Sequence, residues 1–253
     1  MGTYVITGGA SGIGKAIAEQ LQNEGHKTLS VDIQEADIVA DLATAKGREA
    51  AATAIREATA DGLKGLVTSA GLGSHVPNNS LITNVNYFGS VELISALEEH
   101  LAANKASVLL VSSNSAPMET NPAFIECLLA GDAEGACALA EEMQGQPVYS
   151  GTKQAVTIWM RRNTAAYAAK GIRMNAIGPG YTQTPLSAAV EGNPTYGEPI
   201  QQFIASIPVG RPGQPSDMAD AASFLLGEKA SFICGSMLFV DGGHDAMMRP
   251  DNF

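Results

Sequence analysis

The sequence has few of the residues that stabilise small secreted domains or bind metals. It has three cysteines in 253 residues, an odd number. Neither Cys127, Cys137 and Cys234 nor the four histidines show the spacing of a metal site. We therefore expect reduced, mostly buried thiols, no disulfide framework and no bound metal. This pattern favours a cytoplasmic protein.

Positive charge and long apolar runs are also scarce. The sequence has 15 lysines and arginines and 26 aspartates and glutamates, which gives a net charge of −11, and the basic residues form no cluster. An acidic chain without a basic patch disfavours nucleic acid, an anionic membrane surface or an acidic carrier protein as a partner. No run approaches the roughly 18 apolar residues of a membrane span, and the N-terminus enters an apolar run without a signal segment.

The remaining composition is that of an ordinary globular protein, with 45% hydrophobic and 16% charged residues. Short apolar runs alternate with stretches of helical periodicity. Strands are expected at 4–7, 27–32, 38–42, 65–69, 108–111, 172–177 and 237–240, and the main helices at 16–21, 46–60, 84–100, 149–169 and 216–226. Repeated βα units predict one α/β domain over residues 1–253, a Rossmann-type doubly wound parallel sheet of about seven strands with helices on both faces.

A glycine-rich turn joins the first expected strand to the first helix. Glycines let the backbone approach a pyrophosphate closely, and a helix N-terminus presents free N–H groups and the positive end of its dipole. The spacing is Gly-x-x-x-Gly-x-Gly, which differs from the general dinucleotide fingerprint. The residues predicted to bind phosphate here are Gly8, Ser11, Gly12, Ile13 and Gly14.

An acidic residue, Asp32, ends the second expected strand. A carboxylate there can accept hydrogen bonds from the adenosine ribose and repels a 2′-phosphate, and no lysine or arginine follows it directly. The sequence therefore predicts NAD in preference to NADP, although a turn or capping role for Asp32 is the alternative. The other residues expected near the dinucleotide are Asp41, Leu42, Ala70 and Gly71.

Tyr149 and Lys153 are spaced to project from one face of the helix expected at 149–169. A nearby ammonium favours the phenolate, so a phenol with an ordinary pKa of about 10 can act as a base closer to neutrality. Alone, this pattern is more often a solvated helix face. The glycine turn and Asp32 strengthen the catalytic interpretation, because they place a dinucleotide at the same end of the sheet.

Together these motifs resemble the short-chain dehydrogenase/reductase family over nearly the whole chain. The matching residues are Thr7-Gly8-x-x-x-Gly12-x-Gly14, Asp32, Ala70-Gly71, Asn86, Ser112-Ser113, Tyr149-x-x-x-Lys153, Asn175 and Pro179-Gly180. The stretch 241–250 and the overall layout further resemble a branch of this family, the bacterial 3-alpha-hydroxysteroid dehydrogenase/carbonyl reductases. The chain departs from the family at Thr68-Ser69, where an asparagine pair is usual, and in its longer interval between Ser113 and Tyr149.

The resemblance implies an oxidoreductase that transfers a hydride between NAD and a secondary alcohol or ketone. It assigns Tyr149 as general acid or base, Lys153 as the group that lowers the pKa of Tyr149 and holds the nicotinamide ribose, and Ser113 as a hydrogen-bond partner of the substrate oxygen. Asn86 is expected to help hold a water that links Lys153 to solvent. The expected nicotinamide and phosphate contacts are Ile177, Pro179, Gly180, Thr182 and Thr184, although the two threonines are alternatively plain turn residues.

Two segments are expected to shape the substrate site and the assembly. Residues 121–146 are predicted to form a helical insertion, and 184–207 a substrate loop. The similar hydroxysteroid dehydrogenases carry such an insertion, which we expect to lie against the helices that many relatives use in tetramers. A homodimer is therefore predicted, with a tetramer as the alternative. Candidate pocket-wall residues are Pro117, Met118, Tyr181, Leu186 and Met247, whereas His75 is more typical of a solvated loop.

The substrate prediction is a hydroxysteroid or a similar bulky apolar alcohol. A smaller terpenoid or aryl alcohol is the alternative within the same reaction class. A dinucleotide-binding regulator without catalysis is the alternative from another class, and the presence of Ser113, Tyr149 and Lys153 disfavours it.

Overall fold

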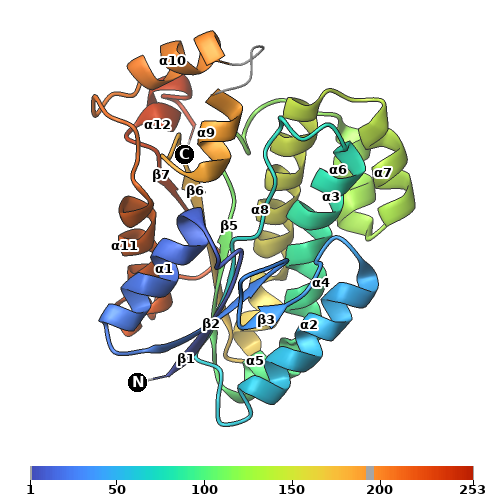
Figure 1. The fold of residues 1–253 in the computed structure, drawn as a ribbon, viewed down its shortest axis with the longest axis vertical. Coiled ribbons are helices and arrows are strands. Elements are labelled where there is room, and N and C mark those ends of the chain that lie inside the picture. Colours follow the sequence, from blue (N-terminus) through green and yellow to red (C-terminus); the bar gives the residue numbers. More distant parts are fainter. Residues whose placement is uncertain (1, 192–196, 253) are drawn as a thin grey trace.

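Seven parallel strands form the centre of the molecule, in the order β3-β2-β1-β4-β5-β6-β7 (Figure 1). The computed structural model describes residues 2–191 and 197–252. The strands are β1 (Thr3–Thr7), β2 (Lys27–Asp32), β3 (Ile38–Val39), β4 (Gly65–Thr68), β5 (Ser107–Val111), β6 (Arg173–Pro179) and β7 (Met237–Val240). The predicted doubly wound sheet is confirmed, with β3 shorter and β6 longer than expected. The strand order reverses between β1 and β4, which is where such sheets bind ligands.

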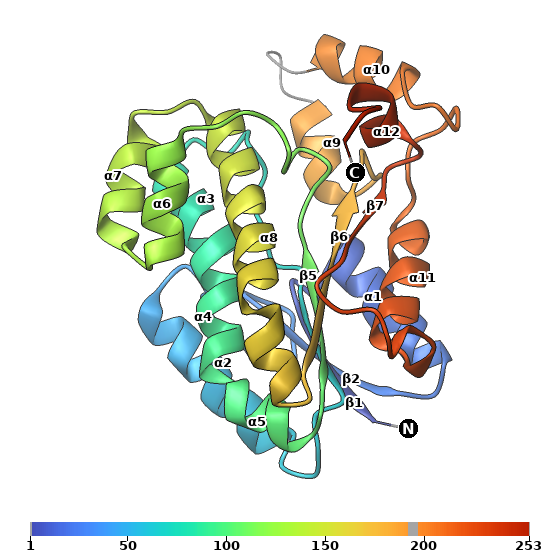
Figure 2. The same ribbon diagram turned by 180° about the vertical axis from the view of Figure 1, so that it is seen from behind.

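Helices cover both faces of the sheet, and each face has its own apolar core. On one face α1 (Gly12–Asn23) packs against α11 (Pro215–Leu226). The other face is covered by α2 (Ala45–Ala58), α4 (Gly89–Ala96) and α8 (Gly145–Ala169), as Figure 2 shows. Strands β1, β4 and β5 are buried along their whole length, because both of their faces lie under helices.

The region predicted as one helix at 84–100 is divided into several elements. It contains a π-helical turn, η1 (Asn84–Phe88), between α3 (Asn79–Thr83) and α4, and α5 (Glu98–Ala103) follows. The single-helix prediction is wrong here, because apolar periodicity does not distinguish i→i+5 from i→i+4 hydrogen bonding. Such π-turns are frequent at functional sites, and this one holds Asn86 in the interior.

Residues 121–146 contain two short helices, α6 (Pro122–Ala130) and α7 (Ala133–Glu141). The side chains of Asn121 and Asp132 accept hydrogen bonds from backbone N–H groups in the first turns of these helices. Gly131 has a φ of 75° and ends α6, which lets the chain reverse. Helix α6 packs on α8 and α7 packs on α3, so the pair covers the outer side of both.

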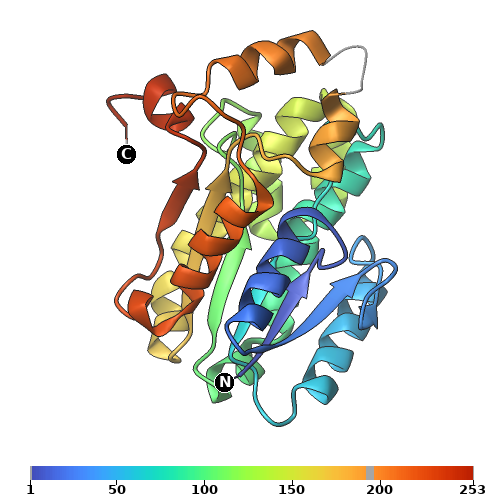
Figure 3. The ribbon, with the colours of Figure 1, turned by 60° about the vertical axis from the view of Figure 1, so that its left-hand side comes forward.

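Three further helices lie at the carboxyl ends of the strands (Figure 1, Figure 3). They are α9 (Pro185–Glu191), α10 (Gly197–Ala205) and α12 (His244–Met248). Most of the segment 184–207, predicted as a loop, is thus helical, and residues 192–196 lie outside the described part of the chain. Within the described residues, no helix has the length and apolarity needed to cross a membrane.

Candidate active site

A cavity of about 950 Å³ opens at the carboxyl ends of the strands, beneath α9, α10 and α12. Residues from both halves of the sheet line it, as expected at a switch point. The lining includes three of the four predicted catalytic residues, Ser113, Tyr149 and Lys153. The predicted cofactor residues that line it are Gly8, Ser11, Gly12, Ile13, Gly14, Asp32, Asp41, Leu42, Ala70, Gly71, Pro179, Gly180, Thr182 and Thr184.

Ile177 is the predicted cofactor residue that does not line the cavity. Its side chain is fully buried in the core on the α1 side of the sheet. Its carbonyl accepts a hydrogen bond of 2.9 Å from the backbone N–H of Ser112. The structure therefore moves Ile177 from the binding site to the core, because a mid-strand residue of β6 uses its backbone in the sheet.

The first turn of α1 is built to accept an anion. No side chain caps it at Ser11, and no acidic residue lies in the turn, so its N–H groups stay available. Gly14 is required by close packing, since a Cβ there would lie 2.2 Å from the carbonyl oxygen of Gly8. Thr7 fixes the adjoining strand end, because its hydroxyl accepts 3.1 Å hydrogen bonds from the backbone of Ser69 and Ala70. This turn fits the pyrophosphate of a dinucleotide.

Asp32 is held at the end of β2 with its carboxylate at the cavity. One carboxylate oxygen accepts a hydrogen bond from the N–H of Ala10 at 3.1 Å, and the other from that of Ile33 at 2.7 Å. Among the described lining residues the cationic side chains are Lys153, which donates to Val111, and Arg249, which pairs with Asp245. A fixed carboxylate that neither of these cations pairs with fits a free ribose diol better than a 2′-phosphate.

A buried arginine supports the part of the cavity that Leu42 lines. Arg48 of α2 is 6% exposed and donates to the carbonyl oxygen of Leu42 at 3.1 Å. Its Nε also pairs with Glu92 of α4 at 2.7 Å, so the charge is compensated. The arrangement fixes the Leu42 backbone, although no sequence motif marks Arg48 for this role.

Tyr149 and Lys153 lie one turn apart on α8, as predicted. The Nζ of Lys153 is 5.9 Å from the centre of the Tyr149 ring and donates to the carbonyl oxygen of Val111 at 2.9 Å. Burial lowers the pKa of Lys153 from 10.5 to about 8. Burial also raises the pKa of Tyr149, and a hydrogen bond with the Ser113 side chain acts in the opposite direction.

These pKa shifts bear on the role expected of Lys153. The sequence predicts that Lys153 lowers the pKa of Tyr149. In the structure the pKa of Tyr149 is raised by burial, and Ser113 is the neighbour that opposes the rise. The physical reason is depth: the helix carries both groups into the interior, where removal from water disfavours both the phenolate and the ammonium.

Asn86 does not line the cavity but lies directly behind Lys153. Its side-chain amide is joined to the backbone of Leu72 by two hydrogen bonds, of 2.7 Å to the N–H and 3.0 Å to the carbonyl. A Cβ on Gly71 would be 3.4 Å from both the Asn86 Oδ1 and the Lys153 Nζ. Gly71 therefore lies beside both of these polar groups.

The substrate half of the cavity matches most of the predicted wall. Pro117, Met118, Tyr181 and Leu186 line it, whereas Met247 does not. Met247 is 49% exposed, and its neighbour Met248 lines the cavity, because the short helix α12 turns Met247 outward. His75, expected in a solvated loop, is partly buried and is not part of the lining.

Several lining residues on α10 and α12 were not predicted. Phe203 and His244 meet edge to face with ring centres 4.2 Å apart. Arg249 donates twice to Asp245, at 2.9 and 3.1 Å. The Gly242-Gly243 pair that precedes α12 could have indicated a turn back over the sheet, but Phe203 has no comparable sequence signal.

The site can move a proton next to a hydride acceptor. A phenol, an ammonium and a serine hydroxyl converge at the end of β5 and α8, and the anion-binding turn and Asp32 lie in the same cavity. Within the described residues there is no group of three or more His, Cys, Asp and Glu side chains that could bind a metal. The side chains of Ser113, Tyr149 and Lys153 are suited to acid–base chemistry beside a dinucleotide held by the turn at 8–14.

Two protein-family models match consecutive parts of the chain. One, described as short chain dehydrogenase, matches residues 3–124. The other, described as enoyl-(acyl carrier protein) reductase, matches residues 136–245. Together they span both the glycine turn and the Tyr149 helix.

Individual relatives match over the full length. The 3-alpha-hydroxysteroid dehydrogenase/carbonyl reductase of Comamonas testosteroni is 39% identical, with 100% of both chains covered. Cyclohexanol dehydrogenase from Acinetobacter sp. (strain SE19) is 31% identical over 95% of this chain and 93% of the relative. The crystal structure of 3-alpha-hydroxysteroid dehydrogenase from Pseudomonas sp. B-0831, complexed with NADH, has a TM-score of 0.94 and 42% identity, covering 99% of this chain and 100% of that one.

Proposed function

Because the chain belongs to the short-chain dehydrogenase/reductase family and is an NAD-dependent oxidoreductase, we propose that it interconverts a bulky apolar secondary alcohol, of the hydroxysteroid type, and the corresponding ketone. The observation that supports this substrate is the apolar part of the cavity lining, which includes Met118, Leu186, Phe203 and Met248. An apolar wall of this kind suits a rigid hydrocarbon skeleton. The 3-alpha-hydroxysteroid dehydrogenases among the relatives agree with it.

In this proposal Tyr149 transfers the proton. It accepts the hydroxyl proton during alcohol oxidation and returns it during ketone reduction, while Ser113 hydrogen-bonds the same oxygen. Lys153 holds the nicotinamide ribose, and Asn86 fixes the backbone behind Lys153. Bound NAD supplies the hydride chemistry. Burial keeps Tyr149 protonated in the free protein, which is the form needed for reduction.

The remaining cavity residues hold the dinucleotide. The turn at 8–14 binds the pyrophosphate, Asp32 binds the adenosine ribose, and Asp41 and Leu42 lie beside the adenine. The segment 179–184 borders the nicotinamide end, and Thr182 is only 5% exposed. The Thr182 hydroxyl donates to the carbonyl of Gly180 at 3.0 Å, which favours an ordered turn over a solvated one.

Residues 184–207 form the proposed substrate cover. Leu186 on α9 and Phe203 on α10 both line the cavity, so this segment contributes side chains to the substrate half. A cover of this kind excludes water from the reacting groups when substrate is present. Smaller cyclic alcohols are the second candidate substrate class, which the similarity to cyclohexanol dehydrogenase favours. The non-catalytic regulator is not retained, because the chain is an enzyme of this family.

We also propose a homodimer in the cytoplasm. The helices α6 and α7 cover α8 and α3, which removes that side of the molecule as a contact surface. At the β7 edge of the sheet, β7 and its flanking segments expose three large apolar side chains, Phe224, Phe232 and Leu238. A second copy of the chain would cover them.

A panel of alcohols tests the substrate proposal. The protein is mixed with NAD and, in turn, a 3-alpha-hydroxysteroid, cyclohexanol, a terpene alcohol and an aryl carbinol, and NADH formation is followed by absorbance. We expect the highest kcat/KM for the steroid. A preference for cyclohexanol would replace the steroid with the smaller substrate class, and no turnover of any secondary alcohol would refute the proposed reaction.

A further inference from the structure

Ser115, two residues after Ser113, has no role in the predicted site. It is 8% exposed and lies in the cavity lining. Both of its hydrogen-bond donors point at the Ser113 hydroxyl. The Ser115 backbone N–H donates to the Ser113 Oγ at 3.1 Å, and the Ser115 Oγ–H donates to the same oxygen at 2.9 Å.

These two contacts occupy the acceptor capacity of Ser113. A hydroxyl oxygen has two lone pairs and one proton. With both lone pairs engaged by Ser115, the Ser113 proton is left to donate outward, into the cavity. Ser113 also hydrogen-bonds the Tyr149 side chain in a way that favours the phenolate, which is the effect of a donor.

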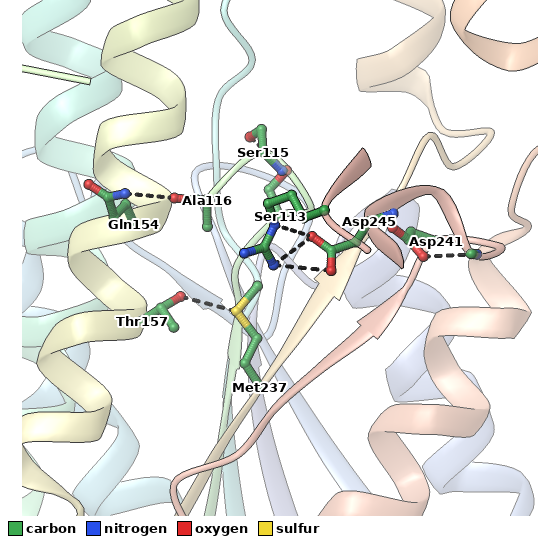
Figure 4. Close-up of polar contacts among 10 residues, drawn as sticks. Ser113, Ser115, Ala116, Gln154, Thr157, Met237, Asp241 and Asp245 are labelled. Atoms are coloured by element: carbon green, nitrogen blue, oxygen red, sulfur yellow. Dashed lines mark hydrogen bonds and ion pairs between the residues drawn. The ribbon is translucent and has the colours of Figure 1, made fainter. Parts of the chain in front are cut away.

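The loop that holds Ser115 is fixed on several sides (Figure 4). The Gln154 side chain of α8, next to Lys153, donates to the carbonyl oxygen of Ala116 at 3.0 Å. The N–H of Asn114 donates to the carbonyl of Pro179 at 2.9 Å, and that of Met118 to the carbonyl of Ser115 at 3.0 Å. The direction of the Ser115 hydroxyl is therefore set by rigid backbone and not by a solvated turn.

We propose that Ser115 is a positioning residue that makes Ser113 an obligatory hydrogen-bond donor to the reacting oxygen. The inference rests on the proposed reaction, in which Ser113 and Tyr149 share the substrate oxygen. A donor fixed toward that oxygen stabilises the negative charge that develops on it during hydride transfer. Without the Ser115 hydroxyl, the Ser113 hydroxyl is free to rotate and to accept a hydrogen bond from Tyr149, which stabilises the neutral phenol.

The test compares the wild-type protein with Ser115→Ala, Ser115→Thr and the control Ser95→Ala. Ser95 is an exposed serine of α4 whose hydroxyl donates to the carbonyl of Val91 at 2.9 Å, away from the cavity. We expect Ser115→Ala to lower kcat about tenfold, the effect of one lost hydrogen bond. Its apparent pKa for alcohol oxidation, from kcat/KM against pH, should rise by about half a unit or more. KM for NAD and the unfolding temperature should stay as in Ser95→Ala.

Ser115→Thr retains the hydroxyl and should keep the kcat and the pH profile near those of the wild type. Unchanged kcat and pH profile in Ser115→Ala, or an equal loss in Ser115→Thr, would overturn the role of this hydroxyl. A parallel loss of NAD affinity and thermal stability in Ser115→Ala would also overturn it in favour of a structural role. An inactive wild type would refute the proposed reaction itself, so the two failures are distinguishable.

Discussion

At the scale of single residues, Tyr149 and Lys153 are both buried on α8, where removal from water favours their uncharged forms. The pKa of Tyr149 is raised by burial, and that of Lys153 is lowered to about 8. Ketone reduction needs a protonated Tyr149, and alcohol oxidation needs the phenolate. Reduction is therefore expected to be favoured at lower pH and oxidation to rise with increasing pH.

The burial of Lys153 should lower the free energy of unfolding of the protein. At pH 7 both the folded and the unfolded protein bind its proton. Between about 8 and 10.5 the unfolded chain alone binds it, so stability rises with pH in this window. We expect Lys153→Met to raise the free energy of unfolding at pH 7 by an amount on the order of 3 kcal/mol, and by less at pH 10. Denaturant titrations at both pH values measure this, with exposed Lys15→Met as the control; an equal gain at both pH values would contradict it.

Asp32 is expected to set the choice between NAD and NADP. Its carboxylate is fixed at the cavity by two backbone N–H groups, so it accepts from a ribose diol and repels a 2′-phosphate. Asp32→Ala should lower the ratio of kcat/KM for NAD over NADP by at least about tenfold. The control is Asp37→Ala, since Asp37 bonds Ser30 and is not in the cavity lining. An unchanged ratio in Asp32→Ala would place the selectivity elsewhere.

At the scale of elements, local signals predicted the strands and the dinucleotide turn. The apolar run that ends at Asp32 and the glycine cluster at 8–14 are short-range patterns, so the residues themselves indicate a strand and a turn. The π-turn around Asn86 was missed because its extra residue leaves apolar periodicity nearly unchanged. Phe203 and Ser115 were missed for another reason: their roles depend on what distant segments place beside them.

The contribution of α10 to the substrate site can be tested at Phe203. Removing its ring takes away part of the apolar wall that a bulky alcohol would contact. Phe203→Ala should therefore raise KM for such an alcohol about tenfold. KM for NAD should not change, and a small alcohol should be affected less. Phe224→Ala on α11, a ring that is 45% exposed and outside the lining, is the matched control. Equal effects on bulky and small alcohols would argue against a substrate-covering role for α10.

At the scale of the whole molecule, the two edges of the sheet differ. The edge at β7 adjoins the exposed rings of Phe224 and Phe232, whereas the exposed large apolar side chains at the β3 edge are the aliphatic Ile33 and Val39. We expect a dimer in analytical ultracentrifugation, and a monomer after Leu238→Lys on β7 because a buried ammonium is costly. Val39→Lys on β3, at a position that is 65% exposed, should remain dimeric. A tetramer assembled through α8 would contradict the proposal.

The whole molecule brings two functions to one end of the sheet: dinucleotide binding by the β1–α1 half and proton transfer by the β5–α8 half. Neither half lines the complete cavity. The family resemblance predicts the roles of the site residues, and the structure shows which of them line the same cavity. Ile177 and Met247 lie outside the cavity lining, and Asn86 contacts Leu72 behind it.

The most direct measurement of the central claim compares wild-type protein and Tyr149→Phe. Both are given NAD and the best alcohol of the panel, and NADH formation and cofactor binding are measured on the same samples. We predict that Tyr149→Phe lowers kcat by about 100- to 10,000-fold, the range for loss of a general base, and leaves NAD affinity close to that of the wild type. Turnover by Tyr149→Phe at the wild-type rate would contradict Tyr149 as the proton-transfer group.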